Sequence, residues 1–119
     1  MKTTNLAEKL TLITEHWSPK IVGELNGQQV KLAKFLGEFV WHHHDNEDEM
    51  FLVLEGNLEM NFRDKVLYAG PGEFIIVPRG VEHKPVATEE VAVLLFEPAT
   101  TVNTGEMRNE LTVTDVERI

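Results

Sequence analysis

The sequence predicts an all-β fold, a sandwich or a barrel, on two observations. Eight Gly and five Pro divide the 119-residue chain at short intervals. The segments between them are short and rich in β-branched and aromatic residues, which favours strands over helices. The chain has no cysteine, so disulfides cannot stabilise it. A chain of this length can form one hydrophobic core, and we expect one domain.

The N-terminal half begins with a possible helical turn and continues with a hairpin. Asn5 is a suitable cap for one or two helical turns over Leu6–Leu10. Asn26-Gly27 is the best hairpin signal, because both central positions of a type I′ turn need positive φ. It should join a strand at Ile21–Leu25 to a strand at Gln29–Leu36.

The middle of the chain shows a second hairpin pattern. Apolar and polar side chains alternate over residues 58–63, which is typical of a strand with one buried face. Arg63-Asp64 should then turn the chain into a strand at Val66–Tyr68.

Three apolar runs do not alternate: Met50–Leu54, Phe74–Val77 and Val91–Phe96. Such runs indicate strands that are covered on both faces. The outer faces need a second sheet layer or a second subunit, and we favour a homodimer for at least part of them. The last segment, Pro98–Ile119, has few large apolar residues and should form an irregular arm across the barrel.

Charge and composition exclude several classes of partner. The chain has 11 Lys and Arg against 20 Asp and Glu, a formal net charge of −9. Nucleic acids and anionic membrane surfaces repel such a protein. The first residues lack the apolar run of a signal peptide, and no stretch approaches the length of a membrane span. We therefore expect a cytoplasmic protein.

The most informative stretch is the histidine-rich segment before the apolar run at Met50. On a strand His42 and His44 project to the same face, while His43 points away. Glu49 opens the apolar run, where a carboxylate is costly to bury without a cation or a hydrogen-bonding partner. His83 follows the run at Phe74–Val77. Taken alone, the histidine-rich stretch could equally be a solvated loop.

Three imidazoles and a carboxylate suit Fe, Mn, Ni or Zn as divalent ions. The same residues carry a resemblance to the cupin family. The first cupin motif is matched by Gly37, His42, His44, Glu49 and Gly56, with one residue fewer between Gly37 and His42. The second motif is matched by Gly72, Pro78, Gly80 and His83, with Ala87 in place of its final Asn.

The resemblance implies an antiparallel double-sheet β-barrel of the jelly-roll type. It implies one cupin domain over residues 1–119, with the barrel at about 20–97 and the arm at 98–119. It also implies that His42, His44, Glu49 and His83 bind one divalent metal ion per chain. Strand parity and the cost of burying a carboxylate single out the same four residues. Only the resemblance, however, predicts that His83 lies close to the other three.

Cupins include isomerases, decarboxylases, dioxygenases and ligand-binding modules, so the fold leaves the chemistry open. Our leading hypothesis is a metal-dependent enzyme that acts on a small oxygen-rich metabolite, with Glu49 as the catalytic residue. The alternative is a non-catalytic module that binds a metal and a small ligand and acts with a separate partner. Four further acids are candidates for proton transfer only by their place in the sequence: Glu38, Glu55, Glu73 and Glu82.

Overall fold

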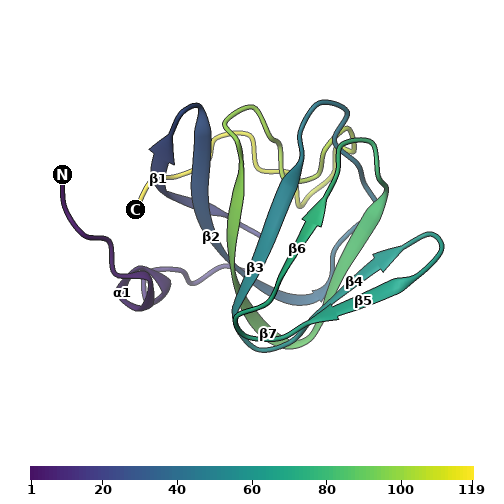
Figure 1. The fold of residues 1–119 in the computed structure, drawn as a ribbon, viewed down its shortest axis with the longest axis horizontal. Coiled ribbons are helices and arrows are strands. Elements are labelled where there is room, and N and C mark those ends of the chain that lie inside the picture. Colours follow the sequence, from purple (N-terminus) through teal and green to yellow (C-terminus); the bar gives the residue numbers. More distant parts are fainter.

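The computed structural model describes all 119 residues. The chain begins with helix α1 (Leu6–Leu10), and seven strands follow (Figure 1): β1 (Lys20–Leu25), β2 (Gln28–Glu38), β3 (Glu49–Glu55), β4 (Leu58–Phe62), β5 (Val66–Ala69), β6 (Phe74–Val77) and β7 (His83–Pro98). All strand pairs are antiparallel. The predicted all-β fold with a short N-terminal helical turn is confirmed.

Two long strands, β2 and β7, connect the two layers of the barrel. One layer has the strand order β1-β2-β7-β3-β6. The other contains β5 and β4, and β4 pairs with the beginning of β7. The register of β2 against β7 shifts between Phe35 and Gly37, where Gly37 has a φ of 85°. This irregularity increases the local bend, as β-bulges do, and glycine allows it because it lacks a Cβ.

The hairpin between β1 and β2 has the predicted turn. Asn26 and Gly27 have φ values of 50° and 77°, and Leu25 pairs with Gln28 across a two-residue loop. Positive φ at both central residues is the type I′ geometry. The turn therefore sets the register of β2 against β1.

The main core lies between the two layers. Phe51, Val53 and Val93 from the larger layer pack with Leu58 and Met60 from β4. A smaller cluster lies outside the barrel, where Leu10 and Ile13 of the N-terminal segment cover Leu32 and Ala92. The N-terminal segment thus covers part of the outer face.

Within one chain β6 is covered on one face only, so the expected cover of its outer face would have to come from a second subunit. Ile75 and Val77 are buried, whereas Phe74 and Ile76 are 58% and 56% exposed. The reason is topological, because β6 is the edge strand of its layer and α1 lies beside β2 at the other side of the sheet (Figure 1).

No helix of the protein is long and apolar enough to cross a membrane.

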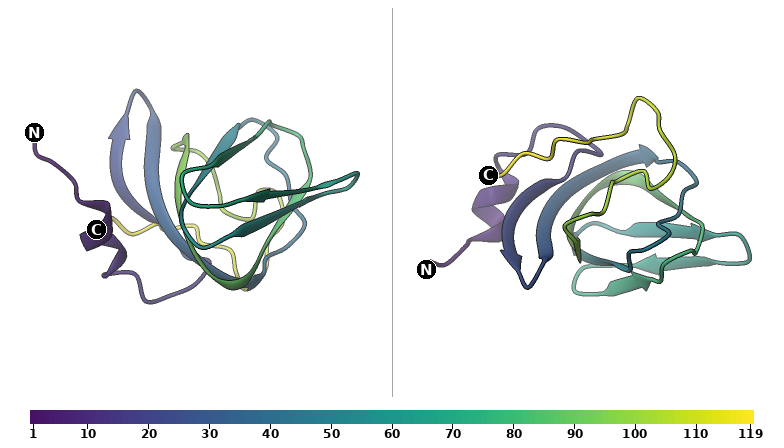
Figure 2. Two further views of the ribbon diagram at one scale, coloured as in Figure 1. Left: turned by 60° about the horizontal axis from the view of Figure 1, so that its bottom comes forward. Right: turned by 90° about the horizontal axis from the view of Figure 1, so that it is seen from above.

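The segment after β7 contains no helix or strand and crosses one end of the barrel, as Figure 2 shows. Its last residues return to β1, where Ile21 N–H donates to the Glu117 carbonyl at 2.9 Å and Ile119 N–H donates to Ile21 at 3.0 Å. Its middle part lies against the histidine-rich segment, because Glu106 N–H donates to the His43 carbonyl at 3.4 Å.

Candidate metal centre

Two of the four predicted side chains come together through the backbone. His42 and His83 form an antiparallel bridge, in which His42 N–H donates to the His83 carbonyl at 3.0 Å and His83 N–H donates to the His42 carbonyl at 2.9 Å. The two imidazole centroids are 4.2 Å apart. This bridge brings the beginning of β7 back to the histidine-rich segment.

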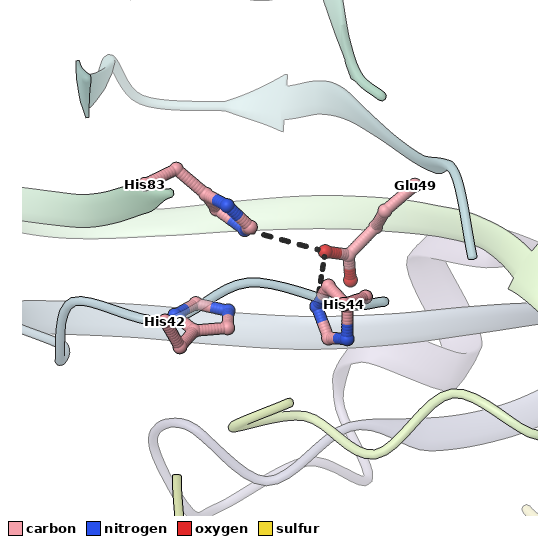
Figure 3. A group of neighbouring side chains, drawn as sticks. All are labelled: His42, His44, Glu49 and His83. Carbon is pink, nitrogen blue, oxygen red and sulfur yellow. Dashed lines mark ion pairs between the residues drawn. The ribbon is translucent and has the colours of Figure 1, made fainter. Parts of the chain in front are cut away.

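His44 and Glu49 complete a buried cluster, shown in Figure 3. One ligand-type atom from each of His42, His44, Glu49 and His83 lies within 4.8 Å of the others, and all four residues are buried. Glu49 Oε1 is 3.2 Å from His44 Nε2 and 3.7 Å from His83 Nε2. The spacing and the donor types are compatible with one divalent ion.

His43 lies outside the cluster. Its side chain is 35% exposed and contacts Asp45 at 3.0 Å, whereas His42 and His44 are 4% and 3% exposed. The predicted alternation therefore holds, although the segment is not the regular strand on which the prediction rested. Only the bridge at His42 is β-structure between Glu38 and Glu49.

Backbone carbonyls hold two of the imidazoles in one tautomer. His42 Nδ1 is 2.8 Å from the Val40 carbonyl oxygen, and His83 Nδ1 is 2.9 Å from the Val81 carbonyl oxygen. A carbonyl only accepts, so each Nδ1 carries the proton and each Nε2 keeps a free lone pair. This is the arrangement that orients histidine ligands in metal sites.

Buried polar atoms without partners test whether the cluster fits a metal. His44 Nε2, His83 Nε2 and Glu49 Oε1 are inaccessible to water and make no hydrogen bond. Their mutual contacts are too long or poorly aligned. An unsatisfied buried polar group costs about 1–3 kcal/mol. A divalent ion would satisfy these atoms together, so the donor set fits a metal.

The electrostatics of the cluster also favour a cation. Burial, with the neighbouring His83 imidazole, lowers the pKa of His42 to about 4, so this imidazole is neutral at neutral pH. Burial alone would raise the pKa of Glu49, but its polar contacts with Glu97, His44 and His83 hold it well below its usual range. The centre therefore offers a carboxylate and a neutral imidazole, the forms that bind metals.

A cavity of about 20 Å³ lies beside His42 and Glu49, which is room for about one water molecule. Its walls are mostly aromatic and apolar: Trp17, Pro19, Phe35, Phe39, Phe51, Pro85, Leu95 and, from the arm, Asn103. The Trp17 ring stacks on Phe35 and Phe39 with centroid separations of 4.3 and 4.7 Å. Trp17 is therefore both a core residue and a wall of this cavity.

Sequence reasoning missed a buried ion pair next to Glu49. Lys31 Nζ donates to Glu97 Oε1 at 2.8 Å, and each residue is 2% exposed. Burial and the charge of Glu49 raise the pKa of Glu97 well above its usual range, against the effect of Lys31. A signal was present, because Glu97 continues the inward-facing series of Val91, Val93 and Leu95 at alternate positions.

The four other acids considered for proton transfer lie away from the cluster, as do Arg79 and Trp41. Glu38, Glu55, Glu73 and Glu82 are exposed. Arg79 contacts Asp48 at the surface, with its backbone N–H 2.8 Å from Asp48 Oδ1. Trp41 packs under Arg63, whose guanidinium carbon is 3.9 Å from the ring centroid, and it does not line the cavity.

Comparisons with known proteins agree with this architecture. A cupin-2 domain protein of Shewanella frigidimarina NCIMB 400 is 46% identical with a TM-score of 0.80, over 81% of this chain and 94% of that chain. Protein NMB1881 of Neisseria meningitidis is 32% identical with a TM-score of 0.76, over 82% and 100% of the two chains.

The uncharacterized protein YdbB of Bacillus subtilis strain 168 is 38% identical over 86 residues, which is 70% of this chain and 74% of that protein. The profile of the cupin domain family matches residues 28–97. That range contains all four clustered side chains and most of the barrel. The chain therefore belongs to the cupin family.

Proposed function

We propose that the protein binds one divalent metal ion through His42, His44, Glu49 and His83. One observation carries this proposal: three buried ligand-type atoms of these residues face one another without hydrogen bonds. Folding would not leave so many buried polar atoms unpaired unless a ligand satisfied them. The ordered tautomers of His42 and His83 add support.

The bound ion would serve an enzyme that acts on a small metabolite with an oxygen donor. A divalent ion supplies Lewis-acid chemistry, which polarises a carbonyl or holds an oxygen donor in place. The cavity beside His42 and Glu49 is the space for such a donor group, and its walls are mostly apolar. Glu49 borders this space and is the proposed catalytic residue. Isomerase, decarboxylase and dioxygenase reactions all fit this arrangement.

The test is metal content in matched histidine variants. Wild type purified without added metal should contain about one Zn, Mn, Fe or Ni per chain by elemental analysis. His42→Ala and His44→Ala should each weaken metal affinity at least about tenfold. His43→Ala is the matched control and should bind like wild type, because its side chain points away. Equal binding by all three variants would refute the proposed ligands.

Metal identity then separates the reaction classes. Iron would indicate oxygen chemistry, and zinc or manganese would indicate isomerase or decarboxylase chemistry. A non-catalytic binding module remains the alternative. A metal ion with all coordination positions taken by protein atoms would favour that module, because a catalytic ion keeps an exchangeable position.

We also propose that the chain forms a homodimer through the outer face of β3 and β6. Phe74 and Ile76 project outward there, and they pair with Leu52 and Met50 of β3. Phe96 extends the same row on β7. Apolar side chains at an exposed sheet edge favour association, and a second copy would cover them.

A further inference from the structure

A second cavity lies under the C-terminal arm, apart from the candidate metal centre. Its volume is about 250 Å³, somewhat below the roughly 300–1,000 Å³ of pockets for drug-sized ligands. The β1–β2 hairpin forms one wall, with Ile21, Gln29 and Lys31, and the arm forms the other, from residues 99–102 and 113–116. No residue lines both this cavity and the smaller one at the metal centre. The space therefore suits a small molecule at a site of its own.

Backbone hydrogen bonds hold the two walls together. Ala99 N–H donates to the Gly27 carbonyl at 3.0 Å, and Ile21 N–H donates to the Glu117 carbonyl at 2.9 Å. The first bond ties the start of the arm to the turn of the hairpin, and the second ties the end of the arm to β1. The cavity is therefore preformed, which lowers the ordering cost of binding a ligand.

Two buried polar groups at this cavity have unused hydrogen-bonding capacity. Thr101 is 5% exposed, and its hydroxyl is buried without a partner in the chain. Lys31 is 2% exposed, and its ammonium group, with three donors, makes one hydrogen bond, to Glu97 at 2.8 Å. Buried polar groups are normally satisfied, so a ligand with oxygen atoms would supply the partners that these walls lack.

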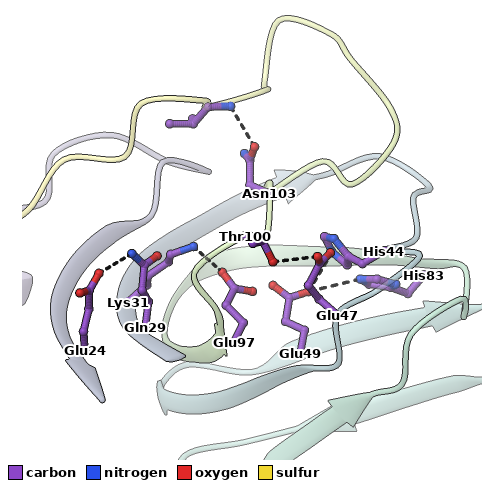
Figure 4. Close-up of polar contacts among 11 residues, drawn as sticks. Glu24, Gln29, Lys31, His44, Glu47, Glu49, His83, Glu97, Thr100 and Asn103 are labelled. Carbon is purple, nitrogen blue, oxygen red and sulfur yellow. Dashed lines mark hydrogen bonds and ion pairs between the residues drawn. The ribbon is translucent and has the colours of Figure 1, made fainter. Parts of the chain in front are cut away.

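The charges at the cavity favour an uncharged ligand. Lys31 is the only ionisable residue that lines it. Figure 4 shows Glu97 and then Glu49 beyond Lys31, so its positive charge is balanced within the chain. A ligand carboxylate would add an unbalanced buried charge, which is costly, and the net charge of −9 also repels anions. A hydroxyl group carries no charge and both donates and accepts, so it can pair with a threonine and with a lysine.

We propose that this cavity binds a small uncharged polyhydroxylated molecule, a polyol or a monosaccharide. Its hydroxyl groups would pair with Thr101 and Lys31. Its C–H groups would pack against apolar side chains of the same walls, Ile21, Val102 and Val113. The site needs no metal ion, so its test is independent of the proposed metal function.

The experiment titrates four probes into wild type, namely glycerol, erythritol, xylitol and D-glucose, and follows methyl and imidazole NMR signals. At least one probe should shift the methyl signals of Val102 and Val113 in a saturable way. The imidazole signals of His42, which belong to the metal centre, should stay unchanged. Sodium propionate is the charged comparison, and it should bind at this cavity more weakly than the best of the four probes.

Two Thr101 variants and a matched control test the hydroxyl. Thr101→Val keeps the shape and removes a hydroxyl that makes no hydrogen bond in the free protein, so urea unfolding should show no loss of stability. Its affinity for the best probe should fall about 3–10-fold, as expected for one hydrogen bond. Thr101→Ser keeps the hydroxyl and should retain most of the affinity. Thr88→Val changes an exposed position of β7 outside the cavity and should bind like wild type.

The outcomes decide the proposal. It is wrong if no probe gives saturable shifts at Val102 and Val113, or if propionate binds there more tightly than all four probes. Equal affinity of wild type and Thr101→Val for the best probe would show that the hydroxyl does not contact the ligand, and would overturn the proposed site. A Thr101→Val protein that is less stable than wild type, or does not fold, would overturn it too, because the hydroxyl would then already have a partner within the chain.

Discussion

Acid should destabilise the metal-free protein through His42. This imidazole is 4% exposed, and burial together with His83 lowers its pKa from 6.5 to about 4. The unfolded chain therefore binds a proton at His42 more readily than the folded chain does. The contribution of His42 to folding stability is therefore fully present above about pH 6.5 and is lost as the pH falls towards 4.

The size of the effect follows from the shift. Each pKa unit corresponds to about 1.4 kcal/mol, so His42 alone should remove about 3 kcal/mol of stability between about pH 7 and pH 4. With a urea dependence of about 1–3 kcal/mol per molar, the unfolding midpoint should fall by about 1–3 M.

The assay is urea unfolding in the presence of a chelator, at several pH values, for wild type and His42→Leu. Other buried groups also titrate, so the difference between the two proteins isolates His42. The variant should lose about 3 kcal/mol less than wild type between about pH 7 and pH 4. Parallel curves for the two proteins would show that the folded environment does not oppose protonation of His42.

Three other predictions test the site, the interface and the arm. Glu49→Gln should weaken the metal less than His44→Ala does, because it keeps an oxygen ligand, but it should abolish any activity that needs a carboxylate; full activity would contradict this. Phe74→Asp should give a monomer by light scattering where wild type gives a dimer, and a wild-type monomer would refute the proposed interface. Gly105→Ala places a Cβ against the His43 carbonyl oxygen at a φ of +61°, so it should loosen the arm and speed its proteolysis, while an unchanged digestion pattern would contradict this.

Local rules predicted much of the barrel from the sequence. Asn26-Gly27 specified a turn by its own φ preferences, and the alternation over residues 58–63 specified β4. The apolar run at Phe74–Val77 was harder to interpret, because periodicity does not reveal whether a strand lies at an edge. Its outward residues are exposed in one chain because the N-terminal segment covers the outer face over β2 and β7 and not over β6.

The residues of the candidate site could be predicted from the sequence, whereas the way in which the fold brings them together could not. Parity placed His42 and His44 together, but the return of His83 depends on a backbone bridge between residues 41 positions apart in sequence. Glu97 was missed because it follows a continuous apolar run, in which the alternation between inward and outward positions is not visible from hydrophobicity. A buried acid that keeps the inward register of a strand is a signal that the sequence did contain.

The walls of the cavity differ in how firmly they are held, and this bears on how a ligand larger than water reaches the centre. Trp17 has a φ of 60°, a costly conformation for an aromatic residue. It is fixed there by its backbone N–H to the Lys34 carbonyl at 2.9 Å and its Nε1–H to the Leu36 carbonyl at 2.8 Å. The contact between the arm and Trp17 is longer, with Asn103 Nδ2 3.5 Å from the Trp17 carbonyl. Weak hydrogen bonds yield before strong ones, so we expect a ligand to displace the arm before it displaces Trp17.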